Sequence, residues 1–546
     1  MLRRTVSLTA LLAGAACAAG ISLSGCDDPE DLFPPDPVDK FEIQPAAGGL
    51  RRLTGTQLRN TIADLLGPSA AALLSVPQDQ QLHGFQSIEA AENAFTPTAI
   101  SAFESSFTLA VDDAISNNLA TVAKIAPCAS TPTEGCFTDI AKKFGRVAWR
   151  RPVTDEETAV LVSIAQQGKA WQGSIKDGIK YELMTILQSP HFLYITEVGE
   201  PEAEFGFRKL NAFELATRMS FFILDRGPDA AGIDAAEQGK LATDDQIRAE
   251  AQRLLKKPEA QAAWDRFVGE VYFISDLSNV SKDPGLFPNF TPKLATSMQQ
   301  GMYQFIRDIV WTRNADAHEL FTSSDYFVDA NLAPLYGVTA PATGFQKMTI
   351  PAAQKRAGII GTAGFLARFA HPDTTSPTRR GRFIQERLLC NDIPPPPPGQ
   401  NTNIPLEEPG QPQTMKQRLV KHKEGACATC HDRMDPLGFA LENYDAMGAF
   451  RTDDRGLPLD TTGEVAELGK FASAVDIGKA LSTNDEAMVC IVKNFIRESM
   501  GHLEIKGEND AIDKLNDEFK KSKFSIQALM AEMCVSPAFK LVDEPK

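Results

Sequence analysis

Apolar residues recur at intervals of three and four along most of this 546-residue chain, and this spacing predicts helices. Leu58, Ile62 and Leu65 share one face of a predicted helix, which opens with the capping box of residues 54–57. Residues 154–157 repeat this start signal. Strand patterns are short and concentrate in residues 456–463, so the sequence predicts a mainly α protein. Further helices with the same apolar spacing are predicted over 210–224, 246–255, 292–312 and 488–500.

Changes in composition divide the chain into several helical modules. The strongest is a run of five prolines at 394–398, which favours a polyproline II spacer or a strap over the surface. No internal repeat is visible. The predicted modules span 49–127, 128–203, 204–340, 350–455 with the proline-rich strap, and 460–546.

The first 25 residues have the features of a signal peptide: a basic start, an apolar run and small residues. Residues 23–26 read Leu-Ser-Gly-Cys and resemble a bacterial lipobox, whose cysteine carries lipid. The alternative is an ordinary signal peptide in which Cys26 stands by chance. We expect an exported, membrane-anchored lipoprotein, lipidated at Cys26, with residues 26–48 as a tether.

The net charge of −16 excludes one class of partner. An acidic chain without a basic, aromatic patch is a poor binder of nucleic acid. We therefore expect no nucleic-acid partner.

Residues 427–431 read Cys-Ala-Thr-Cys-His, the C-x-x-C-H pattern of c-type haem attachment. On a helix, Cys427, Cys430 and His431 share one face, so two thiols can bond the haem vinyl groups while the imidazole ligates iron. A bare C-x-x-C also occurs in structural disulfides, thioredoxin-like pairs and zinc sites. Zinc needs a second ligand pair that the sequence lacks, and the helical, polar flanks do not suit a thioredoxin. We predict haem c, with His431 as its proximal ligand.

Five cysteines remain for disulfides in an oxidising compartment. Cys128 and Cys136 flank a short loop, so we expect them to pair. Cys490 and Cys534 lie on two late predicted helices and are a second candidate pair. Pairing of Cys390 with Cys490 is equally allowed.

Several segments together resemble planctomycete-type, cytochrome-like exported proteins, which are built from five consecutive domains of unknown function. The segment around the haem motif is the most specific part of this resemblance, and residues 499–502 depart from the usual ending of the fifth domain. The resemblance implies architecture and a redox role, but no agreed reaction. Its segments are 51–67, 144–154, 189–194 with 210–220 and 331–337, 356–445, and 488–501 with 526–539.

The sixth iron ligand decides between electron transfer and substrate chemistry at an open iron. His422 matches a typical position of the family and is the first candidate, and Met500 is the second. Met434 follows His431 too closely and is expected to pack in the helix, whereas Met447 stays a possible ligand.

Charged residues flank the motif on both sides. Among Asp435, Glu442 and Asp445, one acid can orient His431 and one can pair with Arg451. A calcium site or simple helix capping with a surface ion pair are the alternatives.

A cluster of arginines precedes the proline run. Arg379, Arg380 and Arg382 are candidates for binding haem propionates, since guanidinium groups suit carboxylates. Ordinary surface charge is the alternative.

These features favour an exported haem protein that passes electrons to or from a partner protein. The competing hypotheses are a haem-dependent oxidoreductase, and a cell-surface enzyme or binding protein that acts on a polymer and has a structural or vestigial haem site. No Gly-x-Ser-x-Gly elbow, zinc-protease helix or phosphate loop supports hydrolysis.

Overall fold

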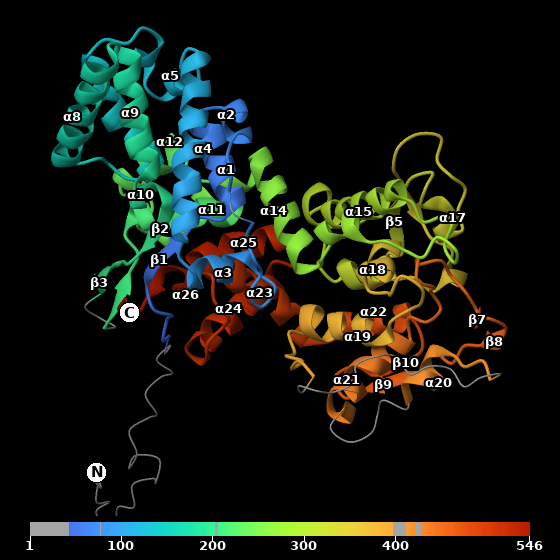
Figure 1. Ribbon diagram of the computed structural model, residues 1–546. Helices are drawn as coiled ribbons and strands as arrows, with labels where there is room; N and C mark the ends of the chain where they lie inside the picture. Colours follow the sequence, from blue (N-terminus) through green and yellow to red (C-terminus); the bar gives the residue numbers. More distant parts are fainter. Residues whose placement is uncertain are drawn as a thin grey trace, which may run out of the picture. The chain divides into compact units, whose positions relative to one another are not determined.

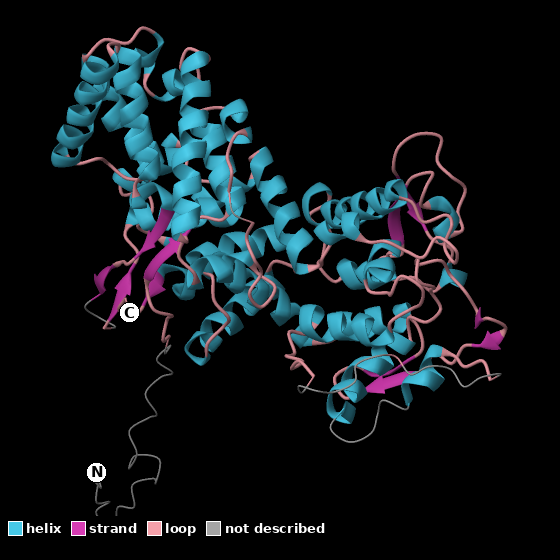
Figure 2. Ribbon diagram, in the orientation of Figure 1, coloured by secondary structure: helices cyan, strands magenta, loops and turns pink. Residues whose placement is uncertain are grey.

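Helices account for 59% of the structure and the strands are few and short, which confirms the predicted mainly α fold (Figure 1, Figure 2). The computed structural model describes residues 43–76, 78–202, 206–396, 404, 411–420 and 427–545. The predicted signal peptide, the lipobox with Cys26 and the candidate ligand His422 lie outside these residues. None of the described helices is both long enough and apolar enough to cross a bilayer.

The first two predicted modules share one hydrophobic core. Strand β1 (Gly49–Arg52) pairs antiparallel with β2 (Tyr194–Glu197), so the two ends of this part meet. Between them lie α1 (Gly55–Leu65), α2 (Pro68–Ala72), α3 (Gln86–Glu92), α4 (Pro97–Ser116), α5 (Val122–Ile125), η2 (Pro127–Ser130), α6 (Gly135–Asp139), the π-helical turn η3 (Ile140–Phe144), α7 (Gly145–Trp149), α8 (Asp155–Gln172), α9 (Ile175–Gln188) and α10 (Pro190–Leu193). The predicted capping boxes at Thr54 and Thr154 are confirmed at the starts of α1 and α8.

The C-terminal helices return to the segment that follows this core. The elements of this part are β3 (Glu200–Glu202), β4 (Phe207–Lys209), α11 (Ala212–Leu224), α12 (Ala230–Glu237), α13 (Asp244–Leu255), α14 (Pro258–Val271), α23 (Asp485–Met500), η11 (Lys506–Glu508), α24 (Asn509–Lys521), α25 (Ile526–Val535), α26 (Pro537–Lys540) and β11 (Leu541–Val542). Helix α25 packs on α13, α23 packs on α11 and α3, and β11 pairs with β4. At this junction Arg266 forms ion pairs with Asp225, Glu270 and Glu498.

The intervening segment, from 275 to 482, contains the C-x-x-C-H pattern. Its elements are η4 (Ser275–Asn279), α15 (Pro292–Arg307), the π-helical turn η5 (Asp308–Thr312), α16 (Glu319–Thr322), β5 (Asp325–Val328), α17 (Ala333–Tyr336), β6 (Gln346–Thr349), η6 (Ala352–Gln354), η7 (Ile359–Gly361), α18 (Ala363–Arg368), α19 (Pro377–Phe383), the π-helical turn η8 (Ile384–Leu388), α20 (Met415–Leu419), α21 (Ala428–Phe439), β7 (Asp453–Asp454), β8 (Leu457–Pro458), β9 (Gly463–Val465), β10 (Gly469–Phe471) and α22 (Ala474–Ser482). The helix predicted over 292–312 thus changes to a π-helical turn after Arg307. The strands predicted near 456–463 appear as β8 and β9.

Glu182 of α9 is a fully buried carboxyl within the first core. Burial raises the pKa of Glu182 from 4.5 to about 9, and the nearby backbone N–H of Ala141 opposes this shift only in part. The folded protein therefore keeps this carboxyl protonated at neutral pH, whereas the unfolded chain ionises it.

Replacement of Glu182 by Gln is expected to raise the free energy of unfolding at neutral pH and to flatten its pH dependence. The unfolded carboxyl loses its proton near pH 4.5 and the folded one near pH 9, so wild-type stability falls as pH rises between these values. The interval from pH 4.5 to neutrality corresponds to on the order of 3 kcal/mol. Thermal denaturation of both proteins across this range measures the effect. If the melting temperature of the wild type changes with pH no more than that of Glu182→Gln, the raised pKa assigned to Glu182 is contradicted.

Candidate functional site

The residues of the C-x-x-C-H pattern lie at the start of α21. Cys427 is the residue before the helix, and Cys430 and His431 follow one turn later on the same face. Both cysteines are half-buried free thiols, not joined to each other. This arrangement fits haem c, because two thiols and one imidazole stand at the spacing that thioether attachment and iron ligation require. Among the residues that the structure describes, no group of three or more His, Cys, Asp or Glu side chains forms a separate metal site.

His431 is held by a buried acid one turn further along α21. Its Nδ1 lies 3.0 Å from Oδ2 of Asp435, whose side chain is fully buried. The other carboxylate oxygen of Asp435 accepts a hydrogen bond of 2.7 Å from the hydroxyl of Thr378, on α19. With Nδ1 bonded to a carboxylate, Nε2 is the ring atom for ligation, and the acid orients the ring. The prediction that an acid in this series orients His431 agrees with this geometry.

Helices α19 and α21 approach each other backbone to backbone. A Cβ atom on Gly381 of α19 would lie 1.8 Å from the carbonyl oxygen of Met434, and one on Gly438 of α21 would lie 2.0 Å from that of Pro377. Two glycines therefore permit the close crossing that brings Thr378 to Asp435.

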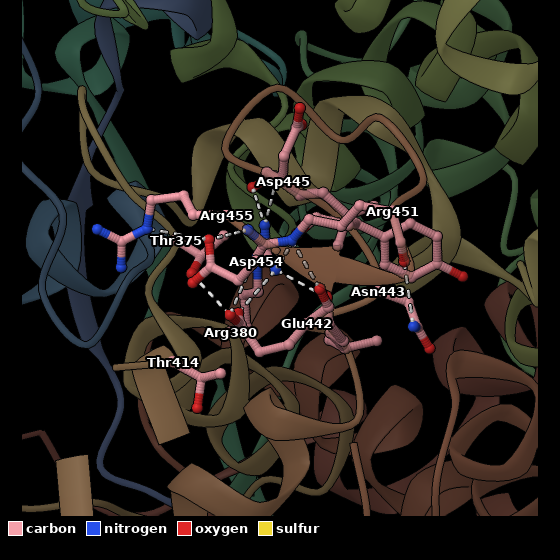
Figure 3. Close-up of polar contacts among 12 residues, drawn as sticks. Thr375, Arg380, Thr414, Glu442, Asn443, Asp445, Arg451, Asp454 and Arg455 are labelled. Atoms are coloured by element: carbon pink, nitrogen blue, oxygen red, sulfur yellow. Dashed lines mark hydrogen bonds and ion pairs between the residues drawn. The ribbon is translucent and has the colours of Figure 1, made fainter. Parts of the chain in front are cut away.

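The segment after α21 is folded around the buried Arg380 of α19 (Figure 3). Its guanidinium group donates to the carbonyl oxygens of Leu441, Tyr444, Asp445 and Leu366, at 2.8 to 3.1 Å. Burial lowers the pKa of Arg380 to about 10, so the group stays charged at neutral pH.

Glu442 supplies the balancing charge. Its oxygens lie 3.5 Å from Arg380 and 2.9 Å from Arg451, and it also accepts from the hydroxyl of Thr375. Burial raises the pKa of Glu442, and the two arginines oppose that shift. Arg451 also pairs with Asp454 at 2.9 Å. The predicted pairing of one acid with Arg451 is thus made by Glu442, and it is largely buried, unlike the surface pair that was the alternative.

The three candidate arginines for haem propionates have different environments. Arg380 is wholly buried and occupied by backbone carbonyls, so its prediction as a propionate ligand is wrong, and so is the alternative of surface charge. Arg382 pairs with Glu386 at 2.7 Å. Arg379 is exposed, and burial of part of its chain together with Arg368 lowers its pKa.

The structure separates the other candidate ligands. Met500 ends α23 beside Gly501, where an added Cβ would lie 2.9 Å from Ser87 and Ala91 of α3, so this end of α23 packs against α3. Met434 is buried in α21 at the crossing with α19, as expected of a packing residue. Met447 lies in the turn after α21, where its N–H donates to Asp445.

Two disulfides join four of the described cysteines. Cys128 pairs with Cys136, eight residues away, and Cys390 pairs with Cys490 across 100 residues. The candidate pair of Cys490 and Cys534 is therefore wrong. Cys490 faces the end of η8, where it lies near the carbonyl oxygen of Arg387, whereas Cys534 is a buried free thiol directed at its own helix. Burial raises the pKa of the Cys534 thiol well above its ordinary value.

Four family models match the chain in series. Each is described as a protein of unknown function: DUF1587 over residues 51–116, DUF1595 over 136–197, DUF1592 over 210–338 and DUF1588 over 356–454. The last is named PSCyt3, and its match includes α21 and the Arg380 network. These matches agree with four of the five domains in the predicted resemblance. Searches of curated proteins and of solved structures find no match.

Sequence reasoning missed the residues that build the site from α19. Thr378 and Gly381 lie in a Ser-Pro-Thr-Arg-Arg-Gly segment, in which only the arginines were predicted as site residues. The sequence signal for close helix packing was a glycine four residues after the proline that starts the helix.

Replacement of Gly438 by Ala is expected to destabilise the segment around α21 strongly. The added methyl meets the Pro377 backbone, which cannot move as a flexible side chain can, and such overpacking costs on the order of 1–3 kcal/mol. Gly49→Ala is the matched control, because no atom lies within 4 Å of its added methyl. Thermal denaturation should show a lower midpoint for Gly438→Ala alone. Equal midpoints for the two variants are the result that contradicts the crossing.

Proposed function

We propose that this protein is an exported, lipid-anchored c-type haem protein with a redox function, chiefly electron transfer to or from a partner protein. The observation that carries the proposal is the start of α21, where two free thiols and a carboxylate-bound imidazole share one helical face. The match to the model named PSCyt3 over this segment supports it. The anchor rests on the lipobox-like residues 23–26.

The roles of the residues follow from their chemistry. Cys427 and Cys430 would each add S–H across one vinyl double bond of haem, so a carbon–sulfur bond forms, the hydrogen moves to the neighbouring carbon, and nothing leaves. His431 would ligate the iron through Nε2. Bound haem supplies one-electron chemistry at iron. Asp435 holds the imidazole in one orientation and raises its basicity. His422 is the proposed first candidate for the sixth ligand, and Met500, which is buried at the end of α23, is the second.

Covalent haem on the wild-type chain is the expected outcome of expression in a host with c-type maturation machinery. The denatured band should stain for haem, and the stain should disappear when Cys427 and Cys430 are both changed to Ser. Cys534→Ala is the matched control and keeps the stain, since that thiol is buried on another helix. A colourless wild-type band with both thiols free or joined to each other overturns the proposal.

Asp435→Asn is expected to raise the reduction potential of the haem protein. The isosteric amide keeps a hydrogen-bonding group near His431 but removes the negative charge that makes the imidazole a stronger donor to iron, so the ferric state is less stabilised. Asp453→Asn on β7 is the control for a lost surface charge, and potentiometric titration is the measurement. A potential unchanged from wild type shows that Asp435 does not tune the iron through His431.

A further inference from the structure

A groove lies over α9, in a part of the chain remote in sequence from the haem motif. Helix α9 lies between α8 and α4 (Figure 1), and it packs against both. The space bounded by these three helices has a volume of about 960 Å³. Small-molecule sites commonly fall between about 300 and 1,000 Å³, so this groove is large enough for an organic ligand.

The base of the groove is apolar and partly aromatic. Trp149, Leu161, Tyr181 and Met184 contribute to its lining. Val160 lines it as well and is 58% exposed. A surface of this kind favours a ligand with an aromatic or alkyl body.

The ring of Tyr181 is fixed in place by the opposite helix. A Cβ atom on Gly168 of α8 would lie 2.4 Å from the ring, so this glycine leaves the space that the ring occupies. Trp171, which is 67% exposed, packs edge to face against the same ring at 5.8 Å between centroids. The aromatic surface of the groove therefore has a defined shape.

The charges around the groove leave an excess of carboxylate. Lys180 is neutralised by Asp112, and Glu157 is neutralised by Arg151 through two hydrogen bonds, of 2.7 and 3.0 Å. The other two acids of the lining, Glu104 and Glu156, form no ion pair with any side chain in the described ranges.

The histidine at the end of the groove does not balance this charge. Burial and then Arg151 lower the pKa of His191, so it is neutral at physiological pH. Its Nε2 lies 3.2 Å from the Arg151 guanidinium group, which suits the neutral ring as acceptor.

We propose that this groove binds an organic cation, a molecule with an aromatic or alkyl body and a single ammonium group. The body would lie on Tyr181 and the apolar lining, and the ammonium group would lie between Glu104 and Glu156. The proposal is independent of the haem function, because it uses only residues of the first two predicted modules, between 104 and 191.

Three probes with the same ring and different charge test it: phenethylamine, 2-phenylethanol and phenylacetate. Isothermal titration of the purified full chain should show that the amine binds more tightly than the alcohol, and that the acid binds most weakly. Added salt should weaken binding of the amine and leave that of the alcohol unchanged.

Variants test the contribution of the two carboxylates separately from that of the aromatic lining. Glu104→Gln and Glu156→Gln should each reduce the affinity for phenethylamine about two- to fivefold, without effect on 2-phenylethanol. Gly168→Ala should weaken the amine and the alcohol alike, because the methyl displaces Tyr181. Glu92→Gln, an exposed acid on α3, is the control and should change nothing.

Three results overturn the proposal. They are equal affinity for the amine and the acid, no measurable heat with any probe, and unchanged amine affinity in the double variant of Glu104 and Glu156. The proposal is also overturned if the chain self-associates through this groove and phenethylamine does not disturb the association. A second copy of the chain would then occupy the groove.

Discussion

The close crossing of α19 and α21 is the constraint on which the candidate haem site depends. Gly381 and Gly438 let the two backbones touch, and only at that separation does the Thr378 hydroxyl reach Asp435. A buried carboxylate without such partners is costly, because it loses water and gains nothing in return. With Thr378 and His431 as partners, Asp435 is stable in the interior, and the imidazole is held in one direction.

The same packing also holds the segment that follows α21 in place. Arg380 sits on α19 within the crossing and binds four carbonyl groups of the surrounding backbone, so α19 organises both the imidazole and the turn beyond the helix. Glu442 and Arg451 complete the buried charges, which keeps the network from holding an uncompensated cation. The disulfide between Cys390 and Cys490 then connects the end of η8 to α23, and α23 packs on α3 and α11.

The two chemical features of the molecule therefore rest on different physics. The candidate haem site depends on a tight helix crossing and on buried hydrogen bonds. The groove over α9 depends on an open space between helices, on exposed aromatic rings and on two carboxylates without ion-pair partners in the described structure. Each joins segments that are separate in sequence: α19 and α21 for the first, and α4 with the consecutive helices α8 and α9 for the second.

Local spacing was enough to predict what depends on neighbouring residues. The capping boxes at Thr54 and Thr154, the helices and the C-x-x-C-H face are set by contacts within one or two turns, so the sequence determined them alone. The Cys128–Cys136 pair is likewise local. Tertiary structure decided what depends on distant partners. It selected Cys390 over Cys534 for Cys490, placed Arg380 inside rather than on the surface, and brought Thr378 to Asp435. Those outcomes depend on which helices pack together and on the distance between them. The spacing of apolar residues along the sequence carries no information about that distance.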